Sequence, residues 1–237
     1  MKLGRAIGVC AAVATLTFRA VRKDQRRIWS FPLTAARGDR WRPALGVLGT
    51  TAALVALDPT TAPWLQRADF QQLPVVVQSN RILSARHTAI AINAMWSLFW
   101  VGGLLRGDAY AGETGLLAGE AALAGQIVAI SMKHLDRRMR PIEAGPDGDF
   151  TRSWFRTKNR NIDGAGCFPS GHTASSFAIA AVFAERYPRR PGVTFAAYAL
   201  ACIVGASRLT SRAHYPSDVF FGAVLGLTAG RHMTAGR

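Results

Sequence analysis

Residues that could carry chemistry gather first at Ser170, Gly171 and His172, which follow Pro169 and open an apolar run. A serine in this position is a typical helix N-cap, so the sequence predicts a helix that begins at Gly171. The first backbone N–H groups of a helix have no partners within it, and they form a ready site for an anion. The imidazole of His172 would add a group that can transfer a proton at that site.

A second group of polar residues follows a later apolar run and contains Ser207, Arg208, His214 and Asp218. His214 and Asp218 are four residues apart, which is about one helical turn. If a helix begins near Pro216, a favoured first position, the carboxylate can reach an imidazole nitrogen. That hydrogen bond would fix the tautomer of the ring and stabilise its charged form. An isolated pair of this kind is more often structural than catalytic, so its meaning depends on its neighbours.

Two cations follow a third apolar run. Lys133 comes directly after the run, and Arg140 directly precedes Pro141. Their spacing of seven predicts that both lie on one helical face, two turns apart. Taken alone, such a pair usually belongs to a basic cluster that holds lipid headgroups. Together with the two histidine segments, it would complete a positively charged site for an anion.

These three segments resemble the signature of the type 2 phosphatidic acid phosphatase superfamily, which also contains bacterial acid phosphatases and vanadium haloperoxidases. The resemblance covers roughly residues 88–230 and does not extend to the first forty residues. The matching segments are Lys133 with six residues before Arg140-Pro141, Pro169-Ser170-Gly171-His172, and Ser207-Arg208 with His214 and Asp218.

The resemblance implies a role for each of these residues. His214 would be the nucleophile that forms a phosphohistidine, Asp218 would orient it, and His172 would be the general acid. The implied phosphate-binding residues are Lys133, Arg140, Ser170, Gly171 and Arg208. Cations and a helix start lower the electrostatic barrier to attack on an anionic phosphate ester, and a protonated imidazole assists a poor alkoxide leaving group.

No metal and no other cofactor is expected. A metal phosphatase needs several carboxylates and histidines around one or two ions. The aspartates near the predicted site show no such grouping; they are Asp136, Asp147, Asp149 and Asp163. The cysteines Cys10, Cys167 and Cys202 are scattered and predict neither a disulfide framework nor a metal site, and Cys202 is expected to be a small core residue.

Six apolar runs must position these residues, and they cover 44–57, 88–105, 114–132, 173–184, 193–206 and 219–230. With their polar flanks they approach the roughly 20 residues that span a bilayer. They lack the regular polar face of a helix in water. We therefore expect an all-α, polytopic membrane helix bundle with about six transmembrane helices; the alternative is a soluble helical bundle. Glu120, an ionisable residue inside one run, is expected to face the bundle interior.

Charge predicts how these helices are oriented. The net charge is +15, and the basic residues lie in connectors rather than among stacking aromatic residues, so a nucleic-acid partner is not expected. The basic segment 19–42 predicts a cytoplasmic N-terminal arm over 1–43, followed by a membrane phosphatase domain over 44–232 and a cytoplasmic tail over 233–237. The apolar stretch 7–18 could be a signal peptide, an interfacial helix or a membrane anchor. Six crossings would place the active site at the outer membrane surface.

The expected function is that of a multi-pass cell-membrane phosphatase, which hydrolyses a lipid phosphate or an isoprenoid (polyprenyl) diphosphate without a metal. The long basic connector 141–168 is expected to cover this anionic substrate. Two alternatives remain open at this point. A vanadium-dependent haloperoxidase is disfavoured by the apolar runs, because the haloperoxidases of this superfamily are soluble. A non-enzymatic protein that binds lipid phosphates is disfavoured because every motif residue is present. The sequence predicts neither the oligomeric state nor the particular lipid.

Overall fold

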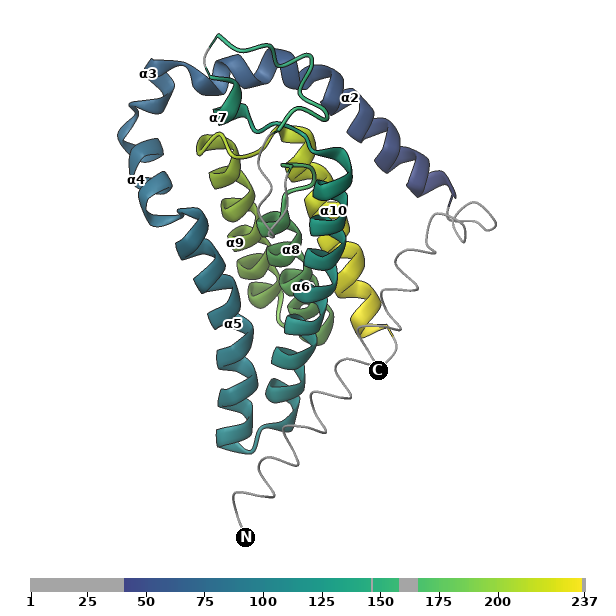
Figure 1. The fold of residues 1–237 in the computed structure, drawn as a ribbon. Coiled ribbons are helices and arrows are strands. Elements are labelled where there is room, and N and C mark those ends of the chain that lie inside the picture. Colours follow the sequence, from purple (N-terminus) through teal and green to yellow (C-terminus); the bar gives the residue numbers. More distant parts are fainter. Residues whose placement is uncertain (1–40, 146, 158–165, 236–237) are drawn as a thin grey trace. The chain divides into compact units, whose positions relative to one another are not determined.

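The computed structural model describes residues 41–145, 147–157 and 166–235, and the regular secondary structure of these residues is helical. In chain order the helices are α2 (Trp41–Gln66), α3 (Ala68–Gln71), α4 (Pro74–Ile82), α5 (Ala85–Arg106), α6 (Ala109–Asp136), α7 (Pro141–Ala144), α8 (Gly171–Arg186), α9 (Pro191–Thr210) and α10 (Pro216–Thr234) (Figure 1). The all-α prediction is confirmed for these residues, and each of the six apolar runs lies within a helix. The stretch 7–18 and nearly all of the predicted N-terminal arm lie outside the described residues, so the division into three regions stays a prediction.

Helix α8 is the central helix among those that carry the site. It packs against α6, α9 and α10, and to a smaller extent against α5. Helices α5 and α6 form an antiparallel hairpin (Figure 1). Gly107 ends α5 with a positive φ of 70°, and the Asp108 side chain caps α6 by accepting a hydrogen bond from Ala111 N at 3.0 Å. This hairpin returns the chain so that α6 ends beside the start of α8.

Small residues let α10 approach α8 closely. Gly222, Gly226 and Gly230 recur every four residues, which places them on one face of α10. A Cβ atom at Gly226 would lie 2.2 Å from Ala174 O, and one at Gly230 would lie 2.5 Å from Ala178 O. The two helices therefore meet backbone against backbone, as small residues allow in membrane bundles.

Gly226→Ala should destabilise the protein by about 1–3 kcal/mol, because the added methyl group forces α8 and α10 apart. Gly102→Ala on α5 is a matched control, since a Cβ there meets no described atom within 4 Å. The control should leave stability unchanged or raise it slightly, because alanine favours helix over glycine. Thermal unfolding in detergent measures both variants, and an equal loss in the two would contradict the close packing.

Four stretches among the described residues are long and apolar enough to cross a membrane: α2, α5, Ala109–Ala144 with α6 and α7, and α9. Large apolar side chains are exposed on them, as lipid contact requires; Leu98 is 70% exposed and Phe195 is 77% exposed. The chain is accordingly a multi-pass membrane protein. Helix α8, with 16 residues, and α10 are not among the four, so a total of six crossings goes beyond this result.

Two side chains within the apolar runs test the expectations about burial. Glu120 is 4% exposed, which confirms that it faces the bundle interior. Cys202 is exposed on α9, so its prediction as a core residue was wrong. The reason is physical: in a membrane helix the lipid-facing side is as apolar as the buried side, and the run of residues does not distinguish them.

Candidate functional site

The three predicted motif segments meet at one end of the bundle. Lys133 lies in the last turn of α6, Arg208 lies in the last turn of α9, and His214 lies between α9 and α10. The start of α8 joins them, because Ser170 N donates a hydrogen bond to Asp218 O at 3.0 Å. Residues that are about 40 to 80 positions apart in the chain therefore converge on one place.

The predicted site residues interact electrostatically with the two histidines. The charges of Asp218, Lys133 and Arg140 act on His214. Arg208, His214 and Lys133 act in turn on His172. The structure thus brings both histidines and all three predicted phosphate-binding cations into one electrostatic neighbourhood.

His214 and Asp218 face each other as predicted, but the predicted hydrogen bond between them is not formed in the described structure. Helix α10 begins at Pro216, as predicted, and Asp218 Oδ2 accepts a hydrogen bond from Tyr215 N at 2.8 Å in a capping box. His214 Nδ1 lies 3.4 Å from the same Oδ2. This distance is long for a hydrogen bond, and Nδ1 makes none with the described residues, so the contact is electrostatic. Contacts of catalytic groups often tighten when substrate binds.

The environment of His214 favours its neutral form. Its side chain is 6% exposed. Burial lowers the pKa of His214 to about 4; Asp218 opposes this shift, whereas the charges of Lys133 and Arg140 add to it. An imidazole must be neutral to act as a nucleophile, and His214 meets that requirement near pH 7.

This shift predicts a pH dependence of stability. The unfolded chain protonates His214 at a pKa of about 6.5, whereas the folded protein does so only near 4. As the pH falls from 6.5 to 4, the unfolded state takes up the proton first, so the free energy of unfolding should fall by up to about 3 kcal/mol. Thermal unfolding of the wild type and of His214→Gln between pH 7.5 and 4.5 measures this. The variant should lose less stability, and equal losses would contradict the assignment.

The start of α8 is where the sequence predicted it. Ser170 is the N-cap residue and is fully buried, and Gly171 is the first helical residue. Within the described chain, the Ser170 side chain makes no cap hydrogen bond to the backbone and instead accepts one from Thr173 Oγ1 at 2.8 Å. A Cβ at Gly171 would lie 2.7 Å from Gln126 Oε1 on α6. A side chain at this position would therefore have to displace the end of the Gln126 side chain.

The connector between α4 and α5, together with the first turn of α5, contacts two of the predicted site residues. His172 Nε2 lies 3.0 Å from Ala85 O. Arg208 is 1% exposed, and its Nη2 donates to Leu83 O and lies 3.3 Å from Thr88 Oγ1. Backbone carbonyls carry no sequence signal, so the motif analysis had no means of finding this connector.

The predicted geometry of Lys133 and Arg140 was wrong. The two do not share a helical face, because α6 ends at Asp136 and Arg137 adopts a positive φ of 46°. Asp136 Oδ1 accepts a hydrogen bond from Arg138 N at 2.9 Å, which stabilises this turn. Arg140 is extended, as expected of a residue before proline, and precedes the short α7. Both cations nevertheless act on His214.

Arg140 has a buried donor without a hydrogen-bond partner among the described residues, as do Arg137 and Arg212. The donor of Arg140 is its Nε atom. Buried polar groups are normally hydrogen-bonded, so a donor left over beside the predicted nucleophile requires an explanation. A guanidinium commonly binds a phosphoryl group through two N–H groups at once.

A buried ionic cluster behind Asp218 was missed by sequence reasoning. Arg138 is 1% exposed and lies between two carboxylates: its Nη1 is 2.6 Å from Asp218 Oδ1, and its Nη2 is 2.6 Å from Asp58 Oδ2. The centre of its guanidinium group lies 4.5 Å from the ring centroid of Trp154 and 3.9 Å from that of Tyr215. The available signal was Asp58 itself, an ionisable residue at the end of an apolar run.

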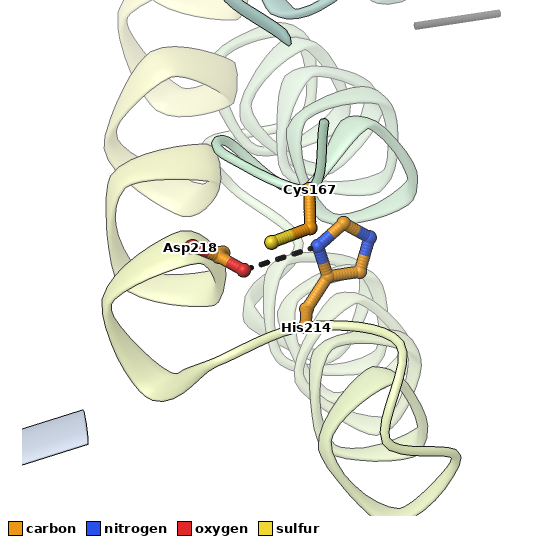
Figure 2. Close-up of side chains that lie close together, drawn as sticks. All are labelled: Cys167, His214 and Asp218. Atoms are coloured by element: carbon orange, nitrogen blue, oxygen red, sulfur yellow. Dashed lines mark ion pairs between the residues drawn. The ribbon is translucent and has the colours of Figure 1, made fainter. Parts of the chain in front are cut away.

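Cys167 lies beside the histidine and aspartate and raises the question of a metal. The Sγ of Cys167, Nδ1 of His214 and a carboxylate oxygen of Asp218 lie within 4.8 Å of one another, and Figure 2 shows them pointing toward a common centre. This donor set fits a metal poorly, because Asp218 is already bonded to the cation Arg138. Burial raises the pKa of the Cys167 thiol well above its usual value, and the thiol donates to Met139 O at 3.4 Å.

The described parts of the basic connector 141–168 lie along the segment that follows α6. Met139 N donates to Ser153 O at 2.8 Å, and Phe155 N donates to Asp136 O at 3.0 Å. Two of the four basic residues used in the prediction, Lys158 and Arg160, lie outside the described residues. The expectation that the connector covers a substrate therefore stays a prediction.

Comparisons with known proteins identify the family of this chain. The model of the PAP2 superfamily matches residues 114–236, just over half of the chain. A lipid A 1-phosphatase of Porphyromonas gingivalis is 42% identical over 67 residues; these are 28% of this chain, which spans only 15% of that relative's length. The crystal structure of a transmembrane PAP2 type phosphatidylglycerolphosphate phosphatase from Bacillus subtilis is 18% identical, with a TM-score of 0.48 over 90% of this chain and 95% of that one. Because this match covers more than half of the chain, the chain belongs to the PAP2 superfamily, and the matched region includes the positions of all eight predicted site residues.

Proposed function

We propose that this protein is an integral membrane phosphatase that removes phosphate from a lipid phosphate or a polyprenyl diphosphate through a phosphohistidine. The main support for the proposal is the environment of His214. Its imidazole is buried and neutral, it faces Asp218, and it interacts electrostatically with Lys133 and Arg140. Membership of the PAP2 superfamily supports the same chemistry. No role for a metal is included, because the residues around His214 fit a phosphoryl group better than a cation.

The proposed reaction has two steps. With Asp218 at Nδ1, His214 presents Nε2 to the phosphorus atom, so a P–N bond forms while the bond from phosphorus to the leaving oxygen breaks. His172 donates a proton to that oxygen. Because burial lowers the pKa of His172 to about 4, the negative charge of the bound phosphate must first stabilise its protonated form. A water molecule, activated by the now neutral His172, then attacks the phosphohistidine and releases inorganic phosphate. Lys133, Arg140 and Arg208 would balance the charge on the phosphoryl oxygens throughout.

The surroundings of the site favour a substrate with a lipid tail. The site lies at the ends of apolar helices, so a headgroup could enter it while the tail remains in the bilayer. The two relatives named above are phosphatases named for the lipids lipid A and phosphatidylglycerolphosphate. Six crossings, with both termini in the cytoplasm and the site at the outer surface of the cell membrane, are part of this proposal, on the basis of the basic connectors.

Phosphate release from a substrate panel tests the function. The purified protein in detergent is given phosphatidic acid, phosphatidylglycerol phosphate, lipid A, undecaprenyl diphosphate and a soluble phosphate ester, each with and without EDTA. We expect release from at least one lipid, undiminished by EDTA. No release from any of them would overturn the proposal and favour a binding protein. Halide oxidation with added vanadate, in the absence of phosphate release, would favour the haloperoxidase alternative.

A further inference from the structure

Three buried charged groups form a continuous cluster on the far side of Asp218 from His214. Asp58, on α2, and Asp218, on α10, are both fully buried, and Arg138 lies between them. Each oxygen of Asp218 is engaged: Oδ1 accepts from Arg138, while Oδ2 accepts from Tyr215 N and faces His214. The orientation of this carboxylate toward the imidazole therefore depends on where Arg138 is held.

Arg138 is in turn held by Asp58. The second nitrogen of its guanidinium donates to Asp58 Oδ2 at 2.6 Å. Ser217 links the same groups, because its Oγ accepts from Arg138 Nη1 at 2.7 Å and donates to Asp58 Oδ2 at 2.5 Å. The backbone N of Ser217 also donates to Asp58 Oδ1, at 3.3 Å. Asp58 thus fixes both the guanidinium and the first turn of the helix that carries Asp218.

Charge gives Asp58 a second effect on the same pair. A single cation between two carboxylates leaves a net negative charge beside the imidazole when both acids are ionised. That charge stabilises the positive charge that develops on His214 during attack on phosphorus. Without the Asp58 charge, Arg138 would be balanced by Asp218 alone, and the imidazole would face a group that is neutral overall.

We propose that Asp58 is a positioning residue for the His214–Asp218 pair, and that it acts through Arg138 and Ser217. This inference rests on the phosphatase function proposed above. Asp58 precedes the matched region 114–236, so the role falls on a helix that the family model does not include. Buried ionic groups that share one hydrogen-bond network are the kind of residues whose effects are coupled.

The test combines a pre-steady-state burst measurement, with substrate in excess, and steady-state kinetics on Asp58→Asn, which keeps the size of the side chain and removes its charge. With a lipid substrate that the wild type hydrolyses, we expect the rate constant of phosphoenzyme formation to fall about tenfold, as coupled network residues allow. The fraction of sites that react, given by the burst amplitude, should stay unchanged, and KM should change less than twofold. Asp69→Asn is the matched control, because Asp69 is a 66% exposed aspartate on α3. It should match the wild type.

The possible results separate this inference from the proposed function. A lower burst amplitude with an unchanged rate constant would show a purely structural role and overturn the inference, as would an Asp58→Asn variant as fast as the wild type. If Asp58→Asn does not fold, the same measurement is made on Ser217→Ala, which removes the hydroxyl that links Asp58 to Arg138. Its rate constant of phosphoenzyme formation should then be the one that falls. A wild type that releases no phosphate from any lipid would overturn the phosphatase function itself and, with it, this inference.

Discussion

His214→Ala is expected to lower the turnover number for lipid phosphate hydrolysis by at least about 10⁴-fold, as removal of a catalytic nucleophile does elsewhere. The variant loses the atom that bonds to phosphorus, and the remaining cations can only bind the substrate. Since Lys133, Arg140 and Arg208 stay in place, binding of the lipid phosphate should persist. Loss of turnover with retained binding is the signature of a group that acts in the chemical step.

Two measurements check this expectation. Phosphate release gives the turnover number, and rapid quenching in base traps a phosphoenzyme, because phosphohistidine is stable in base and labile in acid. The wild type should form this species and His214→Ala should not. His87→Ala replaces an exposed histidine on α5 and serves as the control, with activity equal to the wild type. A His214→Ala protein that is folded and turns over normally would exclude the phosphohistidine mechanism.

Asp218→Asn is expected to have the second-largest effect, and it should affect activity and stability together. Turnover should fall by about 10³- to 10⁴-fold, because the amide no longer fixes the imidazole or stabilises its charged form. Stability should fall by about 3 kcal/mol, because Arg138 loses one of its two buried carboxylate partners. The exposed Asp69→Asn serves again as the control, with neither loss.

The two variants differ in a way that can be measured. His214→Ala should lose activity with little loss of stability, whereas Asp218→Asn should lose both. Turnover numbers and thermal unfolding in the same detergent give the comparison. If Asp218→Asn unfolds at the temperature of the wild type, the ion pair with Arg138 contributes less than its geometry indicates. If it keeps full turnover, Asp218 does not orient His214.

Local rules predicted the parts of the site that depend on neighbouring residues. The starts of α8 at Gly171 and of α10 at Pro216 follow from a serine cap and from proline at the first position. The approach of His214 to Asp218 follows from their separation of four residues across the start of α10. These features need only a few consecutive residues, so the sequence is sufficient to find them.

The features that the sequence did not predict depend on distant parts of the chain or on single backbone angles. The left-handed conformation of Arg137 ends α6 before Arg140, and no glycine is present at this position to predict it. Asp58 and Arg138 are 80 residues apart, and no sequence pattern around either residue indicates that they pair. Whether Cys202 faces lipid or protein depends on which helices pack against α9. Such pairings arise from the packing of whole helices.

The ion pair between Asp58 on α2 and Arg138 also limits how parts of this protein can be exchanged with relatives. A fragment that begins at residue 114 would contain every motif residue, yet Arg138 would keep only one of its two carboxylate partners. In a hybrid built from such a fragment, Arg138 would be balanced by Asp218 alone, and the group beside His214 would be neutral overall rather than negative. Working chimaeras should therefore be cut upstream of Asp58, or receive an acidic residue at the corresponding place from the donor helix.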